Sequence, residues 1–370
     1  MNVAFLCTDY GFSQFSKDPK AGGSCYARCV LPARGLTENG HFAEWFTGMR
    51  IEADGSIGAC RANHGPQGVR NLDGDPVEPP SGKWDVVVLK YLMHPGLAEQ
   101  TLRARTAGQI IVQDVDDDLW RIGATNAARD RTDPVKHPEW NRDHLLAGLQ
   151  VADLVTVTNS YLEAALRREG ITAPILVIPN TIDLREWTRQ PVSQEVTRVG
   201  WVGMTGFRNN DLEQVGPGLR MFLERHRGIT FVHGGRRPDF VPGHRPLKVP
   251  QARIEYREQQ PMDKYPRLWD WLDLAIAPIA PIEFNTAKSP IKIMEGSAAG
   301  VPMLASDFGP YRDWGAVHLV PEKREWDKRL EMMLDYDTRR TWEAVQYERV
   351  SRENLATRWK DWLSAYEALR

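Results

Sequence analysis

Short apolar runs of strand length recur along the chain, and most of them are continuous rather than alternating with polar residues. Continuous runs are typical of strands that are covered on both faces, as in parallel sheets flanked by helices. Segments with helical periodicity separate several of these runs. Up to residue 180 the strand-like runs are NVAFLCT, FAEWF, DVVVLKY, QIIVQD, LVTVTN and ILVIPN. This half of the sequence therefore predicts a series of βαβ units.

The apolar pattern is interrupted over residues 181–197, which we interpret as an interdomain linker. It restarts with RVGWVG, ITFVHGG, DLAIAPI, PMLAS and VHLV. We therefore expect an α/β protein with an N-terminal Rossmann-like domain at 1–185 and a second one at 186–350. Residues 351–370 are amphipathic, and we expect them to form a C-terminal helix that packs back towards the first domain. Two such domains predict a central cleft with ligands at the carboxyl ends of the strands.

The composition is that of a globular protein without a marked preference for nucleic acid or membranes. The 370 residues include 42% hydrophobic and 26% charged residues, and the formal net charge is −2. No apolar run approaches the roughly 20 residues that a membrane-spanning helix needs. The first residues lack the charged and then apolar pattern of a secretion signal. We therefore expect a cytoplasmic protein without stable membrane insertion.

Two features of the first domain are expected to carry no chemistry. The four cysteines, Cys7, Cys25, Cys29 and Cys60, form no C-x-x-C pair, and they predict buried thiols rather than a zinc site. Residues 52–83 are dominated by Gly, Pro and Asp, which predicts a long loop.

The segment KSPIKIMEGSAAGVP at 288–302 predicts a short helix directly after the strand-like run DLAIAPI. Ser289 is a suitable N-cap, and Pro290 is a suitable first helical residue. Gly300 and Pro302 predict the end of this helix. The helix should therefore begin at the carboxyl end of a strand, which is where α/β folds bind ligands.

The start of this helix has the chemistry of a diphosphate site. Unpaired backbone N–H groups around Ser289 and the positive end of the helix dipole attract anions. The ammonium groups of Lys288 and Lys292 would reinforce that attraction. Glu295 lies further along the helix and could accept hydrogen bonds from ribose hydroxyls. The alternative is a surface Lys–Glu pair on an ordinary helix.

Glycines after the first strand of the second domain form another candidate phosphate site. Gly203 and Gly206 follow RVGWV, and Arg208 comes shortly afterwards. Glycines let backbone amides approach a phosphate, and a guanidinium group can bind its oxygens in pairs. A simple strand-to-helix turn is the alternative. His233, after a neighbouring strand-like run, is expected to lie near the nucleotide base.

In the first domain, Gly22 and Gly23 precede a predicted helix with Ser24 as its N-cap. We expect this loop to face the donor phosphates or the acceptor, with Arg28 one turn into the helix. A loop tip without ligand contacts is the alternative.

Acidic residues crowd the end of a strand-like run in QDVDDDLW, namely Asp114, Asp116, Asp117 and Asp118. Crowded carboxylates raise one another's pKa and often bind a cation. We interpret the cluster as acceptor-side or structural, with Asp116 entering the cleft, and an acidic N-cap remains an equal alternative. His94 follows another strand-like run and is an acceptor-side candidate, although a structural histidine is the alternative.

The order of these segments resembles that of family 4 glycosyltransferases, which have the GT-B fold. The likeness lies in GGSCYARCVLPARGLTENGH, IIVQDVDDDLW, ADLVTVTNSYL, IPNTIDLREW, VGWVGMTGFRNNDL and FNTAKSPIKIMEGSAAGVPMLASDFGPY. It spans most of the chain, and the last segment is similar to a bacterial and phage-like subgroup with F-N-x-x-K-S-P-x-K-x-x-E. The resemblance implies two Rossmann-like domains around a cleft. It also implies sugar transfer from a nucleotide-diphosphate donor to a hydroxyl acceptor, with retention of configuration.

By this resemblance, Glu295 corresponds to the second acid of the family's E-x7-E motif, which holds ribose. The first acid falls at Ala287, so Lys288 or Asn285 is expected to replace its sugar contact. Lys288, Arg208 and Glu295 are the expected catalytic residues, and the resemblance implies no dedicated base. No cofactor or metal is expected, and the donor nucleotide remains UDP or GDP.

Three alternatives remain open. Asp114-Val115-Asp116 is literally a D-x-D sequence, which would indicate a metal-dependent glycosyltransferase of the GT-A kind. The missing acid at Ala287 favours a non-catalytic nucleotide-sugar-binding protein. A sugar-phosphate enzyme of the epimerase kind has the same double-Rossmann frame. The acceptor hydroxyl could belong to a glycan, a lipid-linked glycan, a protein or a modified nucleotide, and the oligomeric state stays open.

Overall fold

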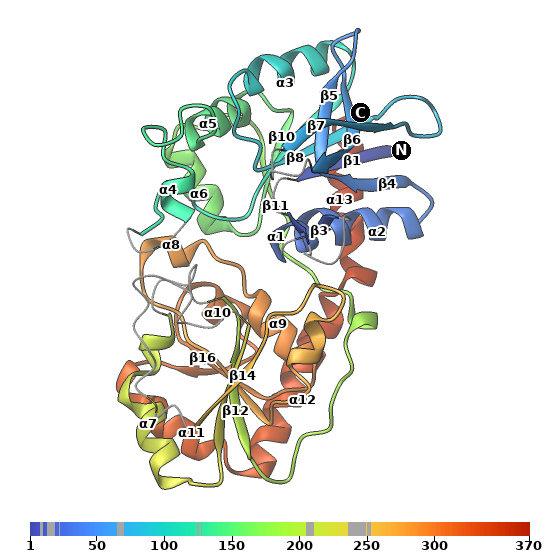
Figure 1. Ribbon diagram of the computed structural model, residues 1–370. Coiled ribbons are helices and arrows are strands. Elements are labelled where there is room, and N and C mark those ends of the chain that lie inside the picture. The colour runs from blue at the N-terminus through green and yellow to red at the C-terminus, as the bar shows by residue number, and fades with distance from the viewer. Residues whose placement is uncertain are drawn as a thin grey trace. The chain divides into compact units, whose positions relative to one another are not determined.

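The computed structural model describes all of the chain except residues 8–9, 13–18, 22, 65–69, 124–125, 127, 205–210, 236–248 and 250–252. The chain divides into two compact units (Figure 1). The N-terminal unit consists of Met1–Trp120, Asp130–Thr181 and Leu355–Arg370, and the C-terminal unit consists of Arg121–Arg129 and Ile182–Asn354. The chain thus passes between the units after Thr181, close to the predicted boundary at 185/186, and the final helix belongs to the N-terminal unit.

The N-terminal unit is built on a parallel sheet of six strands in the order β11-β10-β9-β8-β1-β4. The strands are β1 (Asn2–Cys7), β4 (Phe42–Phe46), β8 (Val86–Lys90), β9 (Ile110–Val115), β10 (Leu154–Val157) and β11 (Ile175–Val177). Every residue of β8 and β10 is buried, as the continuous apolar runs predict. The strand order changes direction between β1 and β8, so the helices that follow these two strands lie on opposite faces of the sheet.

Helices surround this sheet. They are α1 (Gly23–Cys25), a π-helical turn η1 (Tyr26–Val30), α2 (Leu31–Glu38), α3 (Leu97–Thr106), α4 (Ala128–Arg131), α5 (Arg142–Gln150), α6 (Ser160–Arg168) and α13 (Leu355–Glu367). Asn141 and Asn159 cap α5 and α6 by accepting hydrogen bonds from backbone N–H groups. The C-terminal α13 packs closely on α2, because a Cβ atom on Gly35 would lie 2.7 Å from the Cβ of Trp359.

The predicted loop at 52–83 is wrong for half of its length, because Ile57–His64 and Arg70–Val77 are strands. The chain forms an antiparallel sheet of β5 (Gly48–Ile51), β6 (Ile57–His64) and β7 (Arg70–Val77). The turn between β5 and β6 contains Gly55 at φ 86°, and Gly55 N donates to Glu52 O at 2.9 Å. Antiparallel hairpins can face solvent and tolerate polar residues and turn-forming glycines, so they lack the continuous apolar signal of the parallel strands.

The C-terminal unit has a second parallel sheet of six strands, in the order β14-β13-β12-β15-β16-β17. The strands are β12 (Arg198–Val202), β13 (Thr230–Gly234), β14 (Ile254–Arg257), β15 (Leu274–Ala277), β16 (Met303–Ser306) and β17 (His318–Val320). In chain order this is the 3-2-1-4-5-6 arrangement of doubly wound nucleotide-binding folds, whose order reverses between β12 and β15.

Two apolar cores cover the two faces of the second sheet. Residues alternate along each strand, so Val199 and Trp201 belong to one core and Val202 to the other. The helical elements are η2 (Leu184–Glu186), η4 (Asp211–Val215), α7 (Gly216–Arg225), η7 (Tyr265–Leu268), α8 (Glu283–Thr286), α9 (Ile291–Ala298), α10 (Gly309–Trp314), η8 (Lys323–Glu325), α11 (Trp326–Met332) and α12 (Tyr336–Arg352). Within the described residues, no helix combines the length and apolar character that a membrane crossing requires.

The linker predicted at 181–197 is attached to the C-terminal unit by contacts of the buried Arg339 and of Arg189. The guanidinium group of Arg339 donates to the backbone oxygens of Ser193 and Gln194 at 2.8 and 2.9 Å. Arg189 forms a bidentate ion pair with Glu343 at 2.7 and 2.8 Å. Much of this segment is therefore part of the C-terminal unit rather than a free connection.

Candidate functional site

The predicted ligand segments of the C-terminal unit meet where its strand order reverses. β12 ends at Val202 and is followed by Gly203, while β15 leads through α8 to α9. β12 and β15 are neighbours in the sheet. Open α/β sheets bind ligands outside the carboxyl ends of strands at such a switch point. The structure thus brings Gly203 and the start of α9 to the same edge of one sheet.

Gly203 is held by close contacts between two backbone segments. Its N–H donates to Gly234 O at 2.9 Å. Gly235 has φ 118°, and a Cβ atom at that position would lie 2.2 Å from Gly203 O. Only glycine fits at 235, because a side chain would clash with backbone atoms. The predicted residues Gly206 and Arg208 lie outside the described part of the chain.

Lys292 is almost fully buried beside Gly203. It has 3% exposure, its ammonium group donates to Val202 O, and Nζ lies 4.8 Å from the centroid of the Trp201 ring. A Cβ atom on Gly203 would lie 2.8 Å from Nζ of Lys292. Burial of a cation is costly unless anionic or polar groups compensate it. Val202 O and the face of the Trp201 ring supply such polar contacts, and Nζ of Lys292 thus lies at the carboxyl end of β12.

The helix α9 begins one residue later than predicted. Pro290, not Ser289, is its N-cap, and no side chain caps the first turn. Ser289 and Lys288 precede the helix and are half-buried. The predicted stop is confirmed, because Gly300 has φ 74° directly after the C-cap Ala299.

Glu295 is positioned by a residue that the sequence does not indicate. Its Oε2 accepts a hydrogen bond from the Tyr265 hydroxyl at 2.8 Å. The ring of Tyr265 meets that of Trp187 edge-on, with centroids 6.4 Å apart. Tyr265 lies in a short helical turn without a recognisable motif, so only the fold reveals this contact. The hydrogen bond fixes the orientation of a carboxylate on α9.

The two residues considered as replacements for the missing acid differ in their surroundings. Asn285 is 1% exposed, and its Nδ2 donates to Ala280 O at 2.8 Å and to Asp211 Oδ1 at 3.2 Å. It therefore fixes the loop after β15. Nζ of Lys288 lies 4.3 Å from the centroid of the Phe284 ring. Ala287 itself is buried at 2% exposure.

His233 is fully buried on β13. Its ring lies 5.1 Å from that of Trp201 and 5.6 Å from that of Tyr256, measured between centroids. This aromatic group lies on the same sheet as Gly203.

In the N-terminal unit, the predicted glycine loop is described only in part. Gly22 lies outside the described residues, and Gly23 is exposed at the start of α1. The prediction of Ser24 as N-cap is wrong, because the helix starts before it and its hydroxyl donates to Asp116 instead. Ser24 therefore connects the start of α1 to the acidic cluster after β9.

Asp114 and Asp116 belong to a buried network with two cations. Arg28 is fully buried, and its Nη2 lies 2.6 Å from Asp114 Oδ2. Lys90 Nζ lies 2.7 Å from Asp116 and 3.5 Å from Asp114. The hydroxyl of Thr156 donates to Asp114 at 2.7 Å, and that of Tyr91 donates to Asp116. The protein's own cations thus compensate the two carboxylates of the D-x-D sequence.

These contacts control the protonation states in the network. Burial by itself raises the pKa of Asp116, but the Lys90 ammonium group and three side-chain hydrogen bonds lower it well below its usual value. Burial lowers the pKa of Lys90 and of Arg28, whereas the charges of Asp116 and Asp114 raise both above their usual values. Asp116, Lys90 and Arg28 are therefore ionised at neutral pH.

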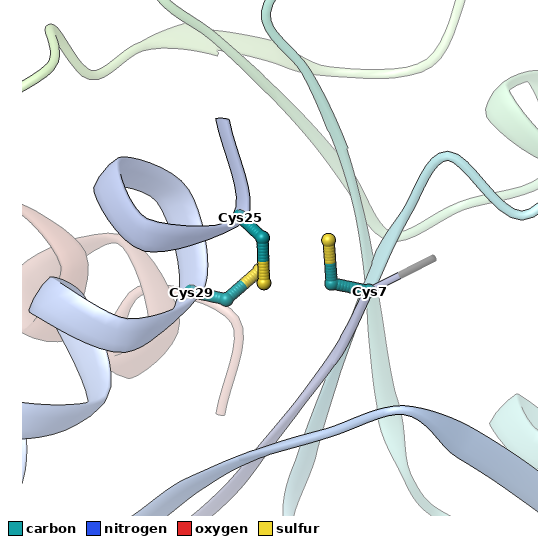
Figure 2. Close-up of side chains that lie close together, drawn as sticks. All are labelled: Cys7, Cys25 and Cys29. Atoms are coloured by element: carbon teal, nitrogen blue, oxygen red, sulfur yellow. The ribbon is translucent and has the colours of Figure 1, made fainter. Parts of the chain in front are cut away.

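Three cysteines of the N-terminal unit lie close together: Figure 2 shows that Cys7, at the end of β1, faces Cys25 and Cys29 from the helical segment opposite. Their sulfur atoms lie within 4.8 Å of one another. The predicted burial of all four cysteines, Cys60 included, is confirmed. Burial raises the pKa of the Cys25 and Cys29 thiols well above their usual value, so both are neutral and pack as apolar groups.

His94 lies beside a cavity at the carboxyl edge of the first sheet. The cavity has a volume of ≈ 520 Å³ and is lined by Leu6, Cys7, Thr47, Gly48, Met49, Arg50, Ile51, Leu92, His94, Gln100 and Trp140. The rings of His94 and Trp140 lie 6.4 Å apart, with planes inclined at 34°. Of the three predicted acceptor-side residues, His94 alone lines this cavity, while Asp116 and Arg28 belong to the charged network.

The fold and these two sheet edges define an α/β protein of the GT-B fold, with two Rossmann-like units. No family model matches the sequence, and no curated protein matches it. Among solved structures, the chain is similar to sucrose-phosphate synthase (tll1590) from Thermosynechococcus elongatus, with a TM-score of 0.64 and 16% identity over 100% of this chain and 98% of that one.

Two further structures match at similar quality. Anabaena Alr3699/HepE in complex with UDP and glucose has a TM-score of 0.65 and 14% identity, with 100% of both chains covered. The pneumococcal O-GlcNAc transferase GtfA, in complex with UDP and GlcNAc, has a TM-score of 0.61 and 10% identity over 100% of this chain and 99% of that one. At these identities the similarity establishes the fold.

Proposed function

We propose that this protein is a retaining glycosyltransferase that moves a sugar from a nucleotide-diphosphate donor, with UDP as the nucleotide, to a hydroxyl acceptor. The observation that carries this proposal is the buried ammonium group of Lys292 beside Gly203, at the switch point of the second sheet. The choice of UDP is supported by the similar HepE structures, which contain UDP, UDP with glucose, or UDP-glucose. The sequence resemblance to family 4 supports retention.

The diphosphate would bind at the carboxyl end of β12 and the start of α9. Backbone amides in the uncapped first turn of α9 supply hydrogen-bond donors. Lys288, Lys292 and Arg208 supply positive charge. Glu295, oriented by the Tyr265 hydroxyl, accepts hydrogen bonds from the ribose.

The reaction requires stabilisation of the departing diphosphate more than it requires a base. The bond between the anomeric carbon and the phosphate oxygen breaks, and a bond from the acceptor oxygen to the same carbon forms on the same face. The acceptor proton passes to the leaving phosphate oxygen, so the product nucleotide carries it away. Fixed amides and cations that already point at the leaving oxygens lower the barrier without reorganisation.

Isothermal titration of UDP and GDP against the wild type and a Lys292→Met variant tests the site. Loss of one buried cation from a diphosphate site should weaken UDP binding by roughly 10- to 100-fold, by analogy with a charge-assisted hydrogen bond of about 1.5–3 kcal/mol. Lys328→Met, at an exposed lysine on α11, is the matched control and should bind UDP as the wild type does. Equal UDP affinity in all three proteins would show that the diphosphate does not bind beside Lys292.

A non-catalytic nucleotide-sugar-binding protein is the second candidate, and buried Ala287 in place of the first motif acid favours it. An assay for the release of UDP from UDP-sugars by the purified protein, with or without an acceptor, separates the two functions. A glycosyltransferase should release UDP, whereas a non-catalytic binding protein should release none. We also propose action in the cytoplasm, where reducing conditions keep the adjacent thiols of Cys7, Cys25 and Cys29 reduced.

A further inference from the structure

The cavity in the N-terminal unit lies at the switch point of the first sheet. Leu6 and Cys7 end β1, Thr47 follows β4, and Leu92 and His94 follow β8. The strand order changes direction between β1 and β8. Ligands of α/β sheets bind at such points, and a volume of ≈ 520 Å³ is within the range of about 300–1,000 Å³ for small-molecule sites.

The antiparallel strand β5 provides one wall of this cavity. Its residues Gly48, Met49, Arg50 and Ile51 all line the cavity. β5 belongs to the small sheet that interrupts the βαβ pattern between β4 and β8. Insertions at the carboxyl ends of parallel strands commonly carry ligand contacts, since loops there are positioned by a rigid scaffold. We therefore expect this sheet to determine what the cavity accepts.

The cavity carries little net charge. Among the lining residues that the structure describes, Arg50 is the one permanently charged side chain, and its Nε and Nη2 bind the Glu52 carboxylate at 2.5 and 2.9 Å. This bidentate pair uses two of the five guanidinium N–H donors, and the Glu52 carboxylate neutralises the charge of Arg50. This arrangement disfavours anionic ligands and favours a neutral one.

An aromatic side chain and two hydrogen-bond acceptors line the cavity. Trp140 stands beside His94 and directly precedes Asn141, whose N–H donates to Met93 O at 3.0 Å. Nδ1 of His94 lies 2.8 Å from Pro95 O, a carbonyl acceptor, and this contact favours the tautomer in which Nδ1 carries the proton and Nε2 is an acceptor. Oε1 of Gln100 is buried and has no hydrogen-bond partner among the residues that the structure describes.

We propose that this cavity binds the acceptor, and that the bound part of the acceptor is a neutral sugar ring. A pyranose has an apolar face that can pack on an indole ring, and hydroxyl groups that can donate to Gln100 and His94. This assignment of the acceptor rests on the proposed glycosyltransferase function. A phosphorylated sugar, a lipid chain and an aromatic alcohol match the lining less well, because each lacks either neutrality or multiple hydroxyl donors.

The test is a binding experiment on the full chain labelled with ¹³C at its methionine methyl groups. The probes are the methyl glycosides of neutral hexoses, pentoses and N-acetylhexosamines, the hexose 6-phosphates, octanol and p-cresol. We expect at least one neutral glycoside to shift the Met49 signal, with hexose 6-phosphates binding at least 10-fold more weakly. Binding of the phosphates, octanol or p-cresol in preference to every glycoside would overturn the assignment.

Substitutions of single lining residues test whether the sugar contacts them. Trp140→Ala and Gln100→Leu should each weaken binding of the shifting glycoside by roughly 3- to 10-fold, which corresponds to one aromatic contact or one hydrogen bond. The control Trp271→Ala, at a 44% exposed tryptophan in the C-terminal unit, should bind it unchanged. Normal glycoside affinity in folded Trp140→Ala and Gln100→Leu proteins would place the sugar elsewhere.

UDP titration of the same sample distinguishes this inference from the proposed function. If UDP binds and no neutral glycoside shifts Met49, the acceptor assignment fails while the donor site stands. If a glycoside shifts Met49 but neither UDP nor GDP binds, the cavity is a sugar site and the glycosyltransferase function fails.

Discussion

Charge compensation at the level of single residues explains why the buried carboxylate of Asp116 remains ionised. Asp116 receives hydrogen bonds from Lys90, Tyr91 and Ser24, which come from a strand, the residue after it and a helix. Asp114 is bound by Arg28 and Thr156 in the same way. Removing one partner from a buried pair leaves the other uncompensated, which is far more costly than losing a surface ion pair.

Asp116→Asn should therefore lower the free energy of unfolding by roughly 3 kcal/mol at pH 7. Because the pKa of Asp116 is lowered in the folded state, its stabilising effect is fully present above the ordinary aspartate pKa. It is lost as the pH falls through the lower folded value. The difference from wild type should thus stay constant between about pH 5 and pH 8 and shrink below about pH 4. Urea unfolding at each pH measures it.

Asp313→Asn, at an exposed aspartate in α10, is the control and should change stability little at any pH. A stability difference for Asp116→Asn that grows on acidification would contradict the ionised state assigned here.

Residue types at the site can be predicted from sequence more readily than their partners. The glycines after β12 and the lysine in α9 predict a phosphate site, and the structure brings Gly203 and Lys292 together. Tyr265 and the burial of Lys292 could not be predicted, because they depend on which segments the fold makes neighbours. For the same reason, Arg28 and Lys90 could not be predicted as partners of the aspartates. Arg28 is 86 residues from Asp114 in the sequence, and Lys90 is 26 residues from Asp116.

At the level of elements, the parallel strands are predictable and the antiparallel ones are not. A strand covered on both faces must be apolar throughout, so it is visible as a continuous run. The small sheet β5–β7 has no such requirement, and its turn-forming residues are typical of a loop. The start of α9 differs by one residue from the prediction, because Pro290 has the N-cap position expected for Ser289. Helix ends depend on local capping geometry, which sequence specifies only loosely.

The backbone segments that follow β12 and β13 approach each other closely at Gly203 and Gly235. This close approach predicts that only glycine is tolerated at position 235. In Gly235→Ala, the methyl group would lie 2.2 Å from Gly203 O, in a backbone conformation with φ 118°. We expect a loss of about 3 kcal/mol in the free energy of unfolding and clearly weaker UDP binding, because Gly203 would be displaced. Thermal or urea unfolding and UDP titration measure the two effects.

Gly228→Ala is the matched control in the same unit, because a Cβ atom there has no neighbour within 4 Å. This substitution should change the free energy of unfolding by no more than about 0.5 kcal/mol, and it should leave UDP affinity unchanged. If Gly235→Ala were as stable and as active as Gly228→Ala, the close backbone approach would not shape the site.

At the level of the whole molecule, each unit has its own sheet, its own apolar cores and its own switch point. The segment after Thr181 is attached to the C-terminal unit by Arg189 and Arg339, and α13 belongs to the N-terminal unit. The chain therefore passes between the units at four points, 120/121, 129/130, 181/182 and 354/355. Any relative movement of the units must be absorbed there rather than along the whole linker predicted at 181–197.

This organisation predicts that binding of the nucleotide changes amide hydrogen exchange mainly within the C-terminal unit. Hydrogen–deuterium exchange with saturating UDP should slow exchange in the amides that follow β12 and in the first turn of α9. β9 and β10 of the N-terminal unit should exchange as in the free protein, because a ligand protects amides by contact or by stabilising the unit that binds it. A neutral glycoside should instead protect the β5 hairpin and the residues after β8. If UDP protected β5 and left α9 unchanged, the donor and acceptor sites would have to be exchanged between the units.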